Sequence, residues 1–512
     1  MTRRAFILPI IILILIILSI FYENLHLELK TPSNGWSRSS SLGISTEKKM
    51  IPFNINEDKV STTYIPANKI IYKVTCSQLL DCKTSKDINV NVPENTAFWM
   101  NNKRVIYLDR GVIYLVNGSD KRKIADNVTS IVTNQNRILY WVDRHLFELD
   151  PMSEQIRSLY KFNYNITEVA FYRDSFIITT EPQQENLLYT YFEHTGEGYK
   201  ITQFPTFSLS YNESLQGLKV QRQDNRLHIY MNILTNSQGN KIYTVKEVIL
   251  NVENPEIRPI TNKLNFIDYR NNQEYNNPRS ISLVGKNYNK ILFTAYGSRV
   301  SKYQGYNLYL AEKKGKNWIA KRVSTTKNLP INPFGINGEG ILWLSFSGED
   351  YSLYGASPKA GVVAESKKVR TADVKNAIYN TITNSFGSIT IFFFSILWII
   401  LPCVFFAYIF FSKNNLLEKE NTKWLVYVPM ALYLVSQIYT FNTSFRIDSY
   451  IYAPAYLTFH GSFVIIPTVL FLVSSCILKF SKLCDISPAG KFVYFAITNI
   501  LFITLLIGSY VL

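Results

Sequence analysis

The side chains best suited to binding chemistry lie in a basic and aromatic segment at residues 279–327. It contains 11 Lys or Arg residues and a single acid, Glu312. The residues that we expect to contact a ligand are Lys286, Lys290, Arg299, Lys302, Lys313, Lys314, Lys316, Lys321 and Arg322, with Trp318 as a stacking group. Cations beside aromatic rings suit an anionic glycan or a lipid headgroup. The alternative interpretation is a solvated strand edge with scattered lysines.

Known catalytic signatures do not occur in the sequence. It has no Gly-x-Ser-x-Gly, His-Glu-x-x-His, phosphate-loop or dinucleotide-binding pattern. STTK at residues 324–327 fits Ser-x-x-Lys, but it lacks the partner motifs of a serine acyl-enzyme. The few histidines are isolated, so we predict no cofactor, no metal and no specific catalytic residue. A glycan-active enzyme stays an alternative, because 34 acids in residues 23–387 leave too many carboxylate pairs to choose between.

Cysteine placement indicates an oxidising compartment for the central part of the chain. Cys76 and Cys82 are the only cysteines in residues 23–387. A close pair of this kind predicts a disulfide in an exported domain. Two free buried thiols are the alternative, and a metal site is disfavoured because no His or further Cys lies nearby.

Two neighbouring segments share a hairpin pattern. "NKRVIYLDRGVIYLV" at residues 102–116 and "NRILYWVDRHLFELD" at 136–150 each contain two apolar runs separated by a polar turn. The pattern predicts β-hairpins. Aligned on the apolar runs, Asp109-Arg110 matches Asp143-Arg144, and we attribute this recurrence to turn chemistry.

Looser copies of the first strand continue along the chain. They occupy residues 68–74, 174–180, 225–232, 289–296 and 338–346. About seven such units at intervals of roughly 35–65 residues indicate propeller blades, because one unit cannot bury its own apolar face. We therefore predict an all-β, β-propeller-like domain of about seven blades over residues 53–360. An irregular β-sandwich is the alternative.

Five apolar segments are long enough to cross a membrane. The first, residues 5–22, follows Arg3 and Arg4 and has no small-residue cleavage site after it, which predicts a retained signal anchor over residues 1–22. The others are residues 389–411, 424–441, 451–478 and 492–511, and they predict a four-helix transmembrane region over 388–512. Three lysines each in loops 412–423 and 479–491 place those loops in the cytoplasm. The domain between the spans, and the end of the chain, are then expected outside it.

Polar side chains within the spans are Gln437, His460 and Asn499. Such groups are costly in a membrane and normally face neighbouring helices. We expect interhelical hydrogen bonds, with a transport path as the alternative.

The remaining segments connect these parts. Residues 23–52 lack an apolar period and are expected to form a linker, and residues 361–387 are expected to form a juxtamembrane helix. The abundance of Asn, Lys, Ile and Tyr is typical of AT-rich genomes. We therefore expect a bacterial cytoplasmic (inner) membrane protein with its large domain on the extracytoplasmic side.

Charge and topology together favour a binding role. Residues 23–387 contain 45 Lys or Arg against 34 Asp or Glu. We expect a scaffold or receptor, rather than an enzyme, that binds a partner protein or an anionic envelope polymer, and an exported location argues against nucleic acid. The alternative is a transporter or envelope-assembly component that works through its membrane helices.

Overall fold

The computed structural model describes most residues of the chain. The chain folds into two compact units. The described residues are 4–47, 53–56, 60–67, 69–77, 80, 82–94, 96–101, 103–196, 198–285, 289–300, 303–336, 340–413, 423–444, 453–481, 483 and 486–510. The propeller unit contains Thr31–Arg299 and Gln304–Lys367. The helical unit contains Met1–Lys30 and Lys368–Leu512.

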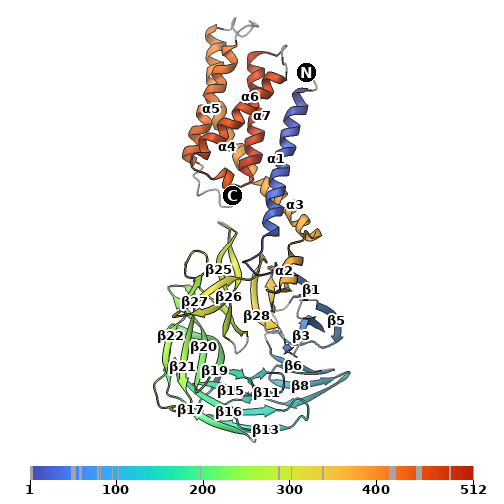
Figure 1. Cartoon of the computed structure of the whole chain (residues 1–512), viewed down its shortest axis with the longest axis vertical. Helices are drawn as coiled ribbons and strands as arrows, with labels where there is room; N and C mark the ends of the chain where they lie inside the picture. Colours follow the sequence, from blue (N-terminus) through green and yellow to red (C-terminus); the bar gives the residue numbers. More distant parts are fainter. Residues whose placement is uncertain are drawn as a thin grey trace. The chain divides into compact units, whose positions relative to one another are not determined.

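The propeller unit consists of seven β-sheets in the described part of the chain (Figure 1). Blade 1 comprises β2 (Phe53–Asn56), β3 (Val60–Ala67), β4 (Ile70–Ser77) and β5 (Cys82–Ile88). Blade 2 comprises β6 (Phe98–Asn101), β7 (Arg104–Asp109), β8 (Val112–Asn117) and β9 (Asp120–Ala125). Blade 3 comprises β10 (Ser130–Thr133), β11 (Ile138–Val142), β12 (His145–Leu149) and β13 (Ile156–Lys161).

The later blades have longer strands. Blade 4 comprises β14 (Ile166–Tyr172), β15 (Ser175–Gln183), β16 (Asn186–His194) and β17 (Tyr199–Gln203), with β18 (Phe207–Ser208) paired to β16. Blade 5 comprises β19 (Glu213–Gln223), β20 (Arg226–Ser237), β21 (Asn240–Asn251) and β22 (Ile260–Lys263). Blade 6 comprises β24 (Arg279–Val284), β25 (Lys290–Val300), β26 (Tyr303–Lys314) and β27 (Asn317–Arg322), with β23 (Phe266–Asp268) parallel to β27. Blade 7 comprises β28 (Leu329–Ile336), β29 (Gly340–Phe346), β30 (Tyr351–Ala356) and β1 (Ser40–Thr46).

The sheets form a ring, so the predicted seven-bladed propeller is confirmed. The first strands of neighbouring blades contact one another: β2 with β6, β6 with β10, β14 with β19, β19 with β24, and β24 with β28. The outermost strands β5, β9, β13 and β22 are largely exposed. Both predicted hairpins are present, as β7–β8 and β11–β12.

The repeated apolar segments are the second strands of six blades, β7, β11, β15, β20, β25 and β29, whereas residues 68–74 fall in β4, the third strand of blade 1. A second strand is covered on both faces by other blades and therefore consists of a continuous apolar run. The four residues Ile138 to Trp141 of β11 are all buried.

Apolar clusters between blades hold the ring together. Separate clusters join blades 3 and 4, 4 and 5, 5 and 6, 6 and 7, and 7 and 1, while one larger cluster spans blades 1, 2 and 3. Each blade thus buries its faces against its neighbours, which explains why a single hairpin unit is not stable alone.

The N-terminal strand closes the ring. β1 pairs antiparallel with β30, so the outermost strand of blade 7 comes from a point in the chain about 300 residues earlier. Ile44 of β1 is buried in the cluster that joins blade 7 to blade 1. The expected linker over residues 23–52 is therefore interrupted by a strand of the propeller, and the propeller begins before residue 53.

The two segments that lead into and out of the propeller are bonded to each other within it. The Ser37 amide donates to the Ser357 carbonyl at 3.0 Å, and the Ser357 amide donates to Ser37 Oγ at 3.0 Å. The Arg38 amide also donates to Ser366 Oγ at 3.1 Å. Ser366 ends α2 (Ala360–Ser366), a short helix of the propeller unit.

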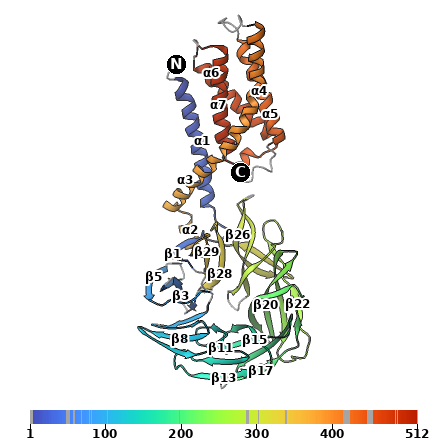
Figure 2. The same cartoon turned by 180° about the vertical axis from the view of Figure 1, so that it is seen from behind.

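The helical unit contains α1 (Arg4–Leu29), α3 (Thr371–Phe386), α4 (Ser388–Lys413), α5 (Trp424–Ser444), α6 (Ser462–Phe480) and α7 (Pro488–Gly508), with the 3₁₀ turn η4 (Ala455–Leu457) before α6. α7 packs against α1, α3, α4, α5 and α6. Figure 2, which turns the view by 180°, shows these helices side by side. The predicted juxtamembrane helix over 361–387 is two helices, α2 and α3.

Five helical segments in the described residues are long and apolar enough to span a membrane. They are Ala5–Leu29, Thr371–Ser412, Trp424–Thr443, Ser462–Phe480 and Pro488–Gly508. The first continues beyond residue 22, and the fourth begins at Ser462 rather than at the expected residue 451.

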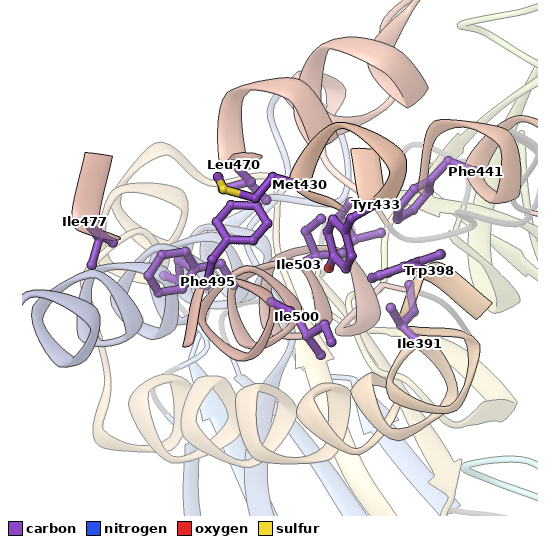
Figure 3. Packing of buried hydrophobic residues seen from close by; sticks show 14 of the residues in the cluster. Ile391, Trp398, Met430, Tyr433, Phe441, Leu470, Ile477, Phe495, Ile500 and Ile503 are labelled. Atoms are coloured by element: carbon purple, nitrogen blue, oxygen red, sulfur yellow. The ribbon is translucent and has the colours of Figure 1, made fainter. Parts of the chain in front are cut away.

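The apolar core of the helical unit combines aliphatic and aromatic side chains. Figure 3 shows Trp398 and Phe441 close to Tyr433, and Phe495 close to Met430. The Trp398 and Tyr433 rings meet edge to face, with centroids 6.1 Å apart. This geometry is favourable for aromatic pairs.

The predicted disulfide is confirmed. Cys76 and Cys82 face each other across β4 and β5 and are bonded. The bond joins the third and fourth strands of blade 1, and Cys76 is fully buried in the cluster with blade 7. Cys403 and Cys476 are exposed free thiols, and Cys484 lies outside the described residues.

Candidate functional site

The basic segment at residues 279–327 forms most of blade 6. It contributes strands β24 to β27 and the turns between them. Placing this charge on one blade agrees with the sequence expectation. The structure distributes the charged side chains in a different way, because successive residues of a strand face opposite sides of the sheet.

Lys313 and Lys314 show this division. Lys313 is opposite Trp318 in the β26–β27 pair, and Lys314 is opposite Asn317. Lys313 points toward blade 5, where its Nζ lies 3.9 Å from Glu247 Oε2. Lys314 is on the other face. The segment therefore does not present a single basic surface.

The remaining expected contact residues occupy several environments. Lys290 Nζ lies 2.7 Å from Glu312 Oε1, and this hydrogen bond, opposed by partial burial, holds the pKa of Glu312 below its usual range. Lys321 is exposed beside the Tyr269 ring, with Nζ 5.7 Å from its centroid. Lys286 and Lys302 lie outside the described residues, and only the backbone of Arg299 is described.

Two of the expected contacts are in the core. Trp318 is 2% exposed and packs edge to face on Tyr230, and Arg322 is 5% exposed. Trp318 is therefore not positioned to stack on a ligand. The exposed basic side chains of the β26–β27 hairpin are Lys313, Lys314, Lys316 and Lys321. Lys313 is directed toward Glu247 and Lys321 lies beside Tyr269, so Lys314 and Lys316 are the two without such a neighbour. We call this pair the blade-6 tip.

A buried acid links blades 5 and 6. Glu247 on β21 is 2% exposed, and His228 Nδ1 on β20 lies 2.9 Å from its Oε1. Burial raises the pKa of Glu247, but the hydrogen bonds from His228 and Tyr230 and the charge of Lys313 outweigh burial and leave it below its usual range. This cluster could not be predicted from the sequence, because its members are dispersed over β20, β21 and β26.

The polar residues of the helical unit form a buried network between helices, as expected for Gln437 and Asn499. Gln437 Nε2 on α5 donates to Asn499 Oδ1 on α7 at 3.0 Å, and the Tyr433 hydroxyl donates to the same oxygen at 3.0 Å. Asn499 Nδ2 donates to Ser474 Oγ on α6 at 3.3 Å. The network thus joins three helices.

His460 differs from the expectation. It lies in the exposed turn before α6, which begins two residues later, so it is not within a helical span. The wrong assignment follows from placing the start of this span at residue 451.

Cavities lie in other blades of the propeller unit. One of about 580 Å³ is lined by residues of blades 1 and 2, among them Lys73, Lys103 and Arg104, and by Met152 of blade 3. Another, of about 560 Å³, lies in blade 3 and includes Asp143 and Arg144. No group of His, Cys, Asp and Glu among the described residues is arranged to hold a metal ion.

These features define a class of protein: a seven-bladed β-propeller joined to helices long enough to span a membrane. Searches for a matching protein family and for a related curated protein find none.

Solved structures similar to this chain include a β-propeller domain and a WD40 domain. The Cps50 (Swd1) β-propeller domain from Myceliophteria thermophila is 8% identical, with a TM-score of 0.38 over 61% of this chain and 99% of that one. The WD40 domain of SCAP from fission yeast is 7% identical, with a TM-score of 0.35 over 64% and 100%. Hsv2p from Kluyveromyces lactis is 9% identical, with a TM-score of 0.33 over 60% and 95%. Likenesses this low carry no argument about function.

Proposed function

We propose that the chain is a membrane-anchored binding scaffold whose propeller captures an anionic polymer on the extracytoplasmic side of a bacterial cytoplasmic membrane. The observation that carries this proposal is the closed ring, in which the chain enters through β1 and leaves through β30 of one blade. Propellers with this arrangement are rigid platforms whose turns and channel rims bind partners.

The tether of the propeller supports a display role. Both ends of the propeller continue into apolar helices, α1 before it and α3–α4 after it. Within the helical unit, Asn24 Nδ2 of α1 donates to Thr381 Oγ1 of α3 at 3.0 Å, and Asn380 Nδ2 donates to Glu28 Oε1 at 3.1 Å. The segments that enter and leave the propeller are thus bonded to each other within each unit.

The Cys76–Cys82 disulfide and the lysines of loops 412–423 and 479–491 support an extracytoplasmic propeller. Alkaline phosphatase is active only after export, so fusions to it report on which side of the membrane a residue lies. A fusion after Lys367 retains α1 and the whole propeller and should be active, whereas a fusion near Glu418, in the loop after α4, should be inactive. The reverse pattern would reject the proposed topology.

An acidic polymer is the partner that the charge favours. The propeller carries an excess of basic residues, and the blade-6 tip exposes two of them. Attraction between exposed charges depends on salt, because the Debye length shortens from about 10 Å at 0.1 M to about 3 Å at 1 M. Retention of an acidic polymer should therefore fall as salt rises.

Purified full-length protein in detergent should be retained by immobilised polygalacturonate at 0.1 M salt, less at 1 M salt, and not by neutral dextran. Lys314→Glu with Lys316→Glu should weaken retention. Lys313 is left unchanged because a carboxylate there would face the buried Glu247. The control is Lys241→Glu with Lys263→Glu, the same charge change on exposed residues of blade 5. Equal retention by polygalacturonate and dextran, or by both double variants, would contradict the proposal.

A further inference from the structure

The 560 Å³ cavity in blade 3 combines a cationic rim with an aromatic wall. Its lining comes from the β11–β12 turn, from β12, from the last residue of β13 and from the loop that leads into blade 4. Its size falls within the range of about 300–1,000 Å³ that is typical of small-molecule sites.

Arg144 is fixed at this cavity by the local backbone. β11 ends at Val142 and β12 begins at His145, so Asp143 and Arg144 form a two-residue turn, and Asp143 has a positive φ of 52°. The corresponding turn of blade 2 is Arg110-Gly111, because Asp109 is still in β7. The Asp-Arg dipeptides of the two hairpins are therefore offset by one residue, and Arg144 lies where blade 2 has a glycine.

The guanidinium of Arg144 is held on one side by the loop before blade 4. Its Nη1 donates to the Asn163 carbonyl at 3.0 Å, and its Nε donates to Asn165 Oδ1 at 3.4 Å. No protein acceptor for Nη2 is found among the described residues. An arginine oriented in this way can offer two N–H groups to a carboxylate.

A second cation lies on the same rim. Lys161, the last residue of β13, is directly opposite His145 on β12, and it is exposed. Within the described part of the chain, neither Lys161 nor Arg144 forms an ion pair. With Asp143 as the single acid of the lining, the cavity has an excess of positive charge.

The wall beneath these charges is aromatic. His145 and Phe147 are two residues apart in β12 and therefore lie on the same face, with ring centroids 5.4 Å apart. Phe147 also stacks on Tyr140 of β11, with ring centroids 5.2 Å apart. Both lining rings are half-buried and keep exposed surface. Half-exposed rings suit the apolar face of a sugar, and the polar side chains of Asn165 and Asp143 suit its hydroxyl groups.

The cavity near blade 2 provides a contrast. Its Arg104 already pairs with Glu154 at 3.1 Å and donates to the Met152 carbonyl at 2.7 Å. The charge of Arg104 is therefore neutralised by Glu154, whereas Arg144 of the blade-3 cavity has no carboxylate partner among the described residues.

We propose that the blade-3 cavity binds a uronic acid unit of an acidic polysaccharide. The carboxylate pairs with Arg144 and Lys161, and the sugar ring packs on His145 and Phe147. This inference rests on the proposed binding of an anionic polymer and names its repeating unit, at a site separate from the blade-6 tip.

The test uses full-length protein in detergent and isothermal titration with trigalacturonate, with neutral maltotriose as the matched ligand. The parent should prefer trigalacturonate by tenfold or more. Because hydrogen bonds between charged groups are the strong ones, Arg144→Gln should weaken trigalacturonate binding about tenfold or more. Lys161→Gln should also weaken it, and it leaves the bonds of Arg144 to the loop intact. Arg110→Gln, in the corresponding turn of blade 2, should bind as the parent does.

Unfolding temperatures identify a variant that fails to fold, and Lys161→Gln then provides the deciding measurement. Equal affinity for the two trisaccharides, or parental affinity in both cavity variants, would overturn the inference. If the parent still retains polygalacturonate in that case, the proposed function stands without this site. If trigalacturonate binds at Arg144 but the polymer is not retained, the site stands and the polymer-binding function falls.

Discussion

Ile44→Asp should open the propeller ring, whereas Ser45→Asp, one residue later on the same strand, should leave it closed. Ile44 is 3% exposed and packs against both blade 7 and blade 1, and Ser45 faces solvent. A carboxylate at Ile44 loses the burial of an aliphatic side chain and places a charge in an apolar cluster. The expected cost is about 4 kcal/mol or more.

The measurement is thermal unfolding of the full chain in detergent, followed by circular dichroism in the β-sheet region, together with limited trypsin digestion. Ile44→Asp should lower the unfolding temperature of the sheet signal and expose cleavage sites near residues 31–47. Ser45→Asp adds the same charge to the same strand and controls for charge alone. Equal unfolding temperatures in the two variants would show that β1 is not needed for closure.

Glu247→Ala should be the most destabilising single change between blades 5 and 6. Removing a buried acceptor leaves its hydrogen-bond donors unsatisfied, which costs about 1–3 kcal/mol for each donor. Here His228 and Tyr230 would both lose their acceptor. Glu256→Ala removes an exposed acid from the same blade and should be neutral.

Chemical unfolding of the parent, Glu247→Ala, His228→Ala and the double variant would measure the coupling. The double variant should cost clearly less than the sum of the two single changes. Additive costs would mean that the two residues do not act as a pair.

Lowering the pH should weaken the contacts of Glu247 with its partners. The folded pKa of Glu247 lies below its usual value of about 4.5, so its charge stabilises the fold above that pH. The contribution is lost as pH falls from about 4.5 through the lower folded pKa. Glu247→Gln keeps the shape without the charge and should lose less stability than the parent over this range. Parallel pH profiles for the two proteins would contradict the role of the charge.

The sequence predicted the propeller because the second strands of its blades are sandwiched between neighbours. Such strands contain continuous apolar runs, such as the ILYWV of β11, that stand out from the rest of the chain. β1 was missed for the opposite reason. Its sequence, SSLGIST, is mostly polar with one buried aliphatic residue, and its partner β30 is about 300 residues away. Pairing at that distance leaves no local signal.

The candidate sites also depend on contacts between residues that are distant in the sequence. A strand period of two already implies that Lys313 and Lys314 face opposite ways, but the number of basic residues in the segment conceals it. The blade-3 cavity combines Arg144 from a turn with Lys161 from the outermost strand and Asn165 from the next loop. Their proximity depends on the register of β12 with β13, which the sequence does not specify.

Ring closure by β1 also determines when the propeller can be completed. The partner strand β30 is synthesised about 300 residues after β1, an interval of roughly 15–60 s at 5–20 residues per second. During that time β1 has no permanent pairing partner, and blades 1 to 6 have to remain ordered or protected as an open arc. The last blade then closes in a single late step. A chain that stops before Ala356 therefore leaves an unpaired strand at each end of the arc. Unpaired strand edges promote aggregation.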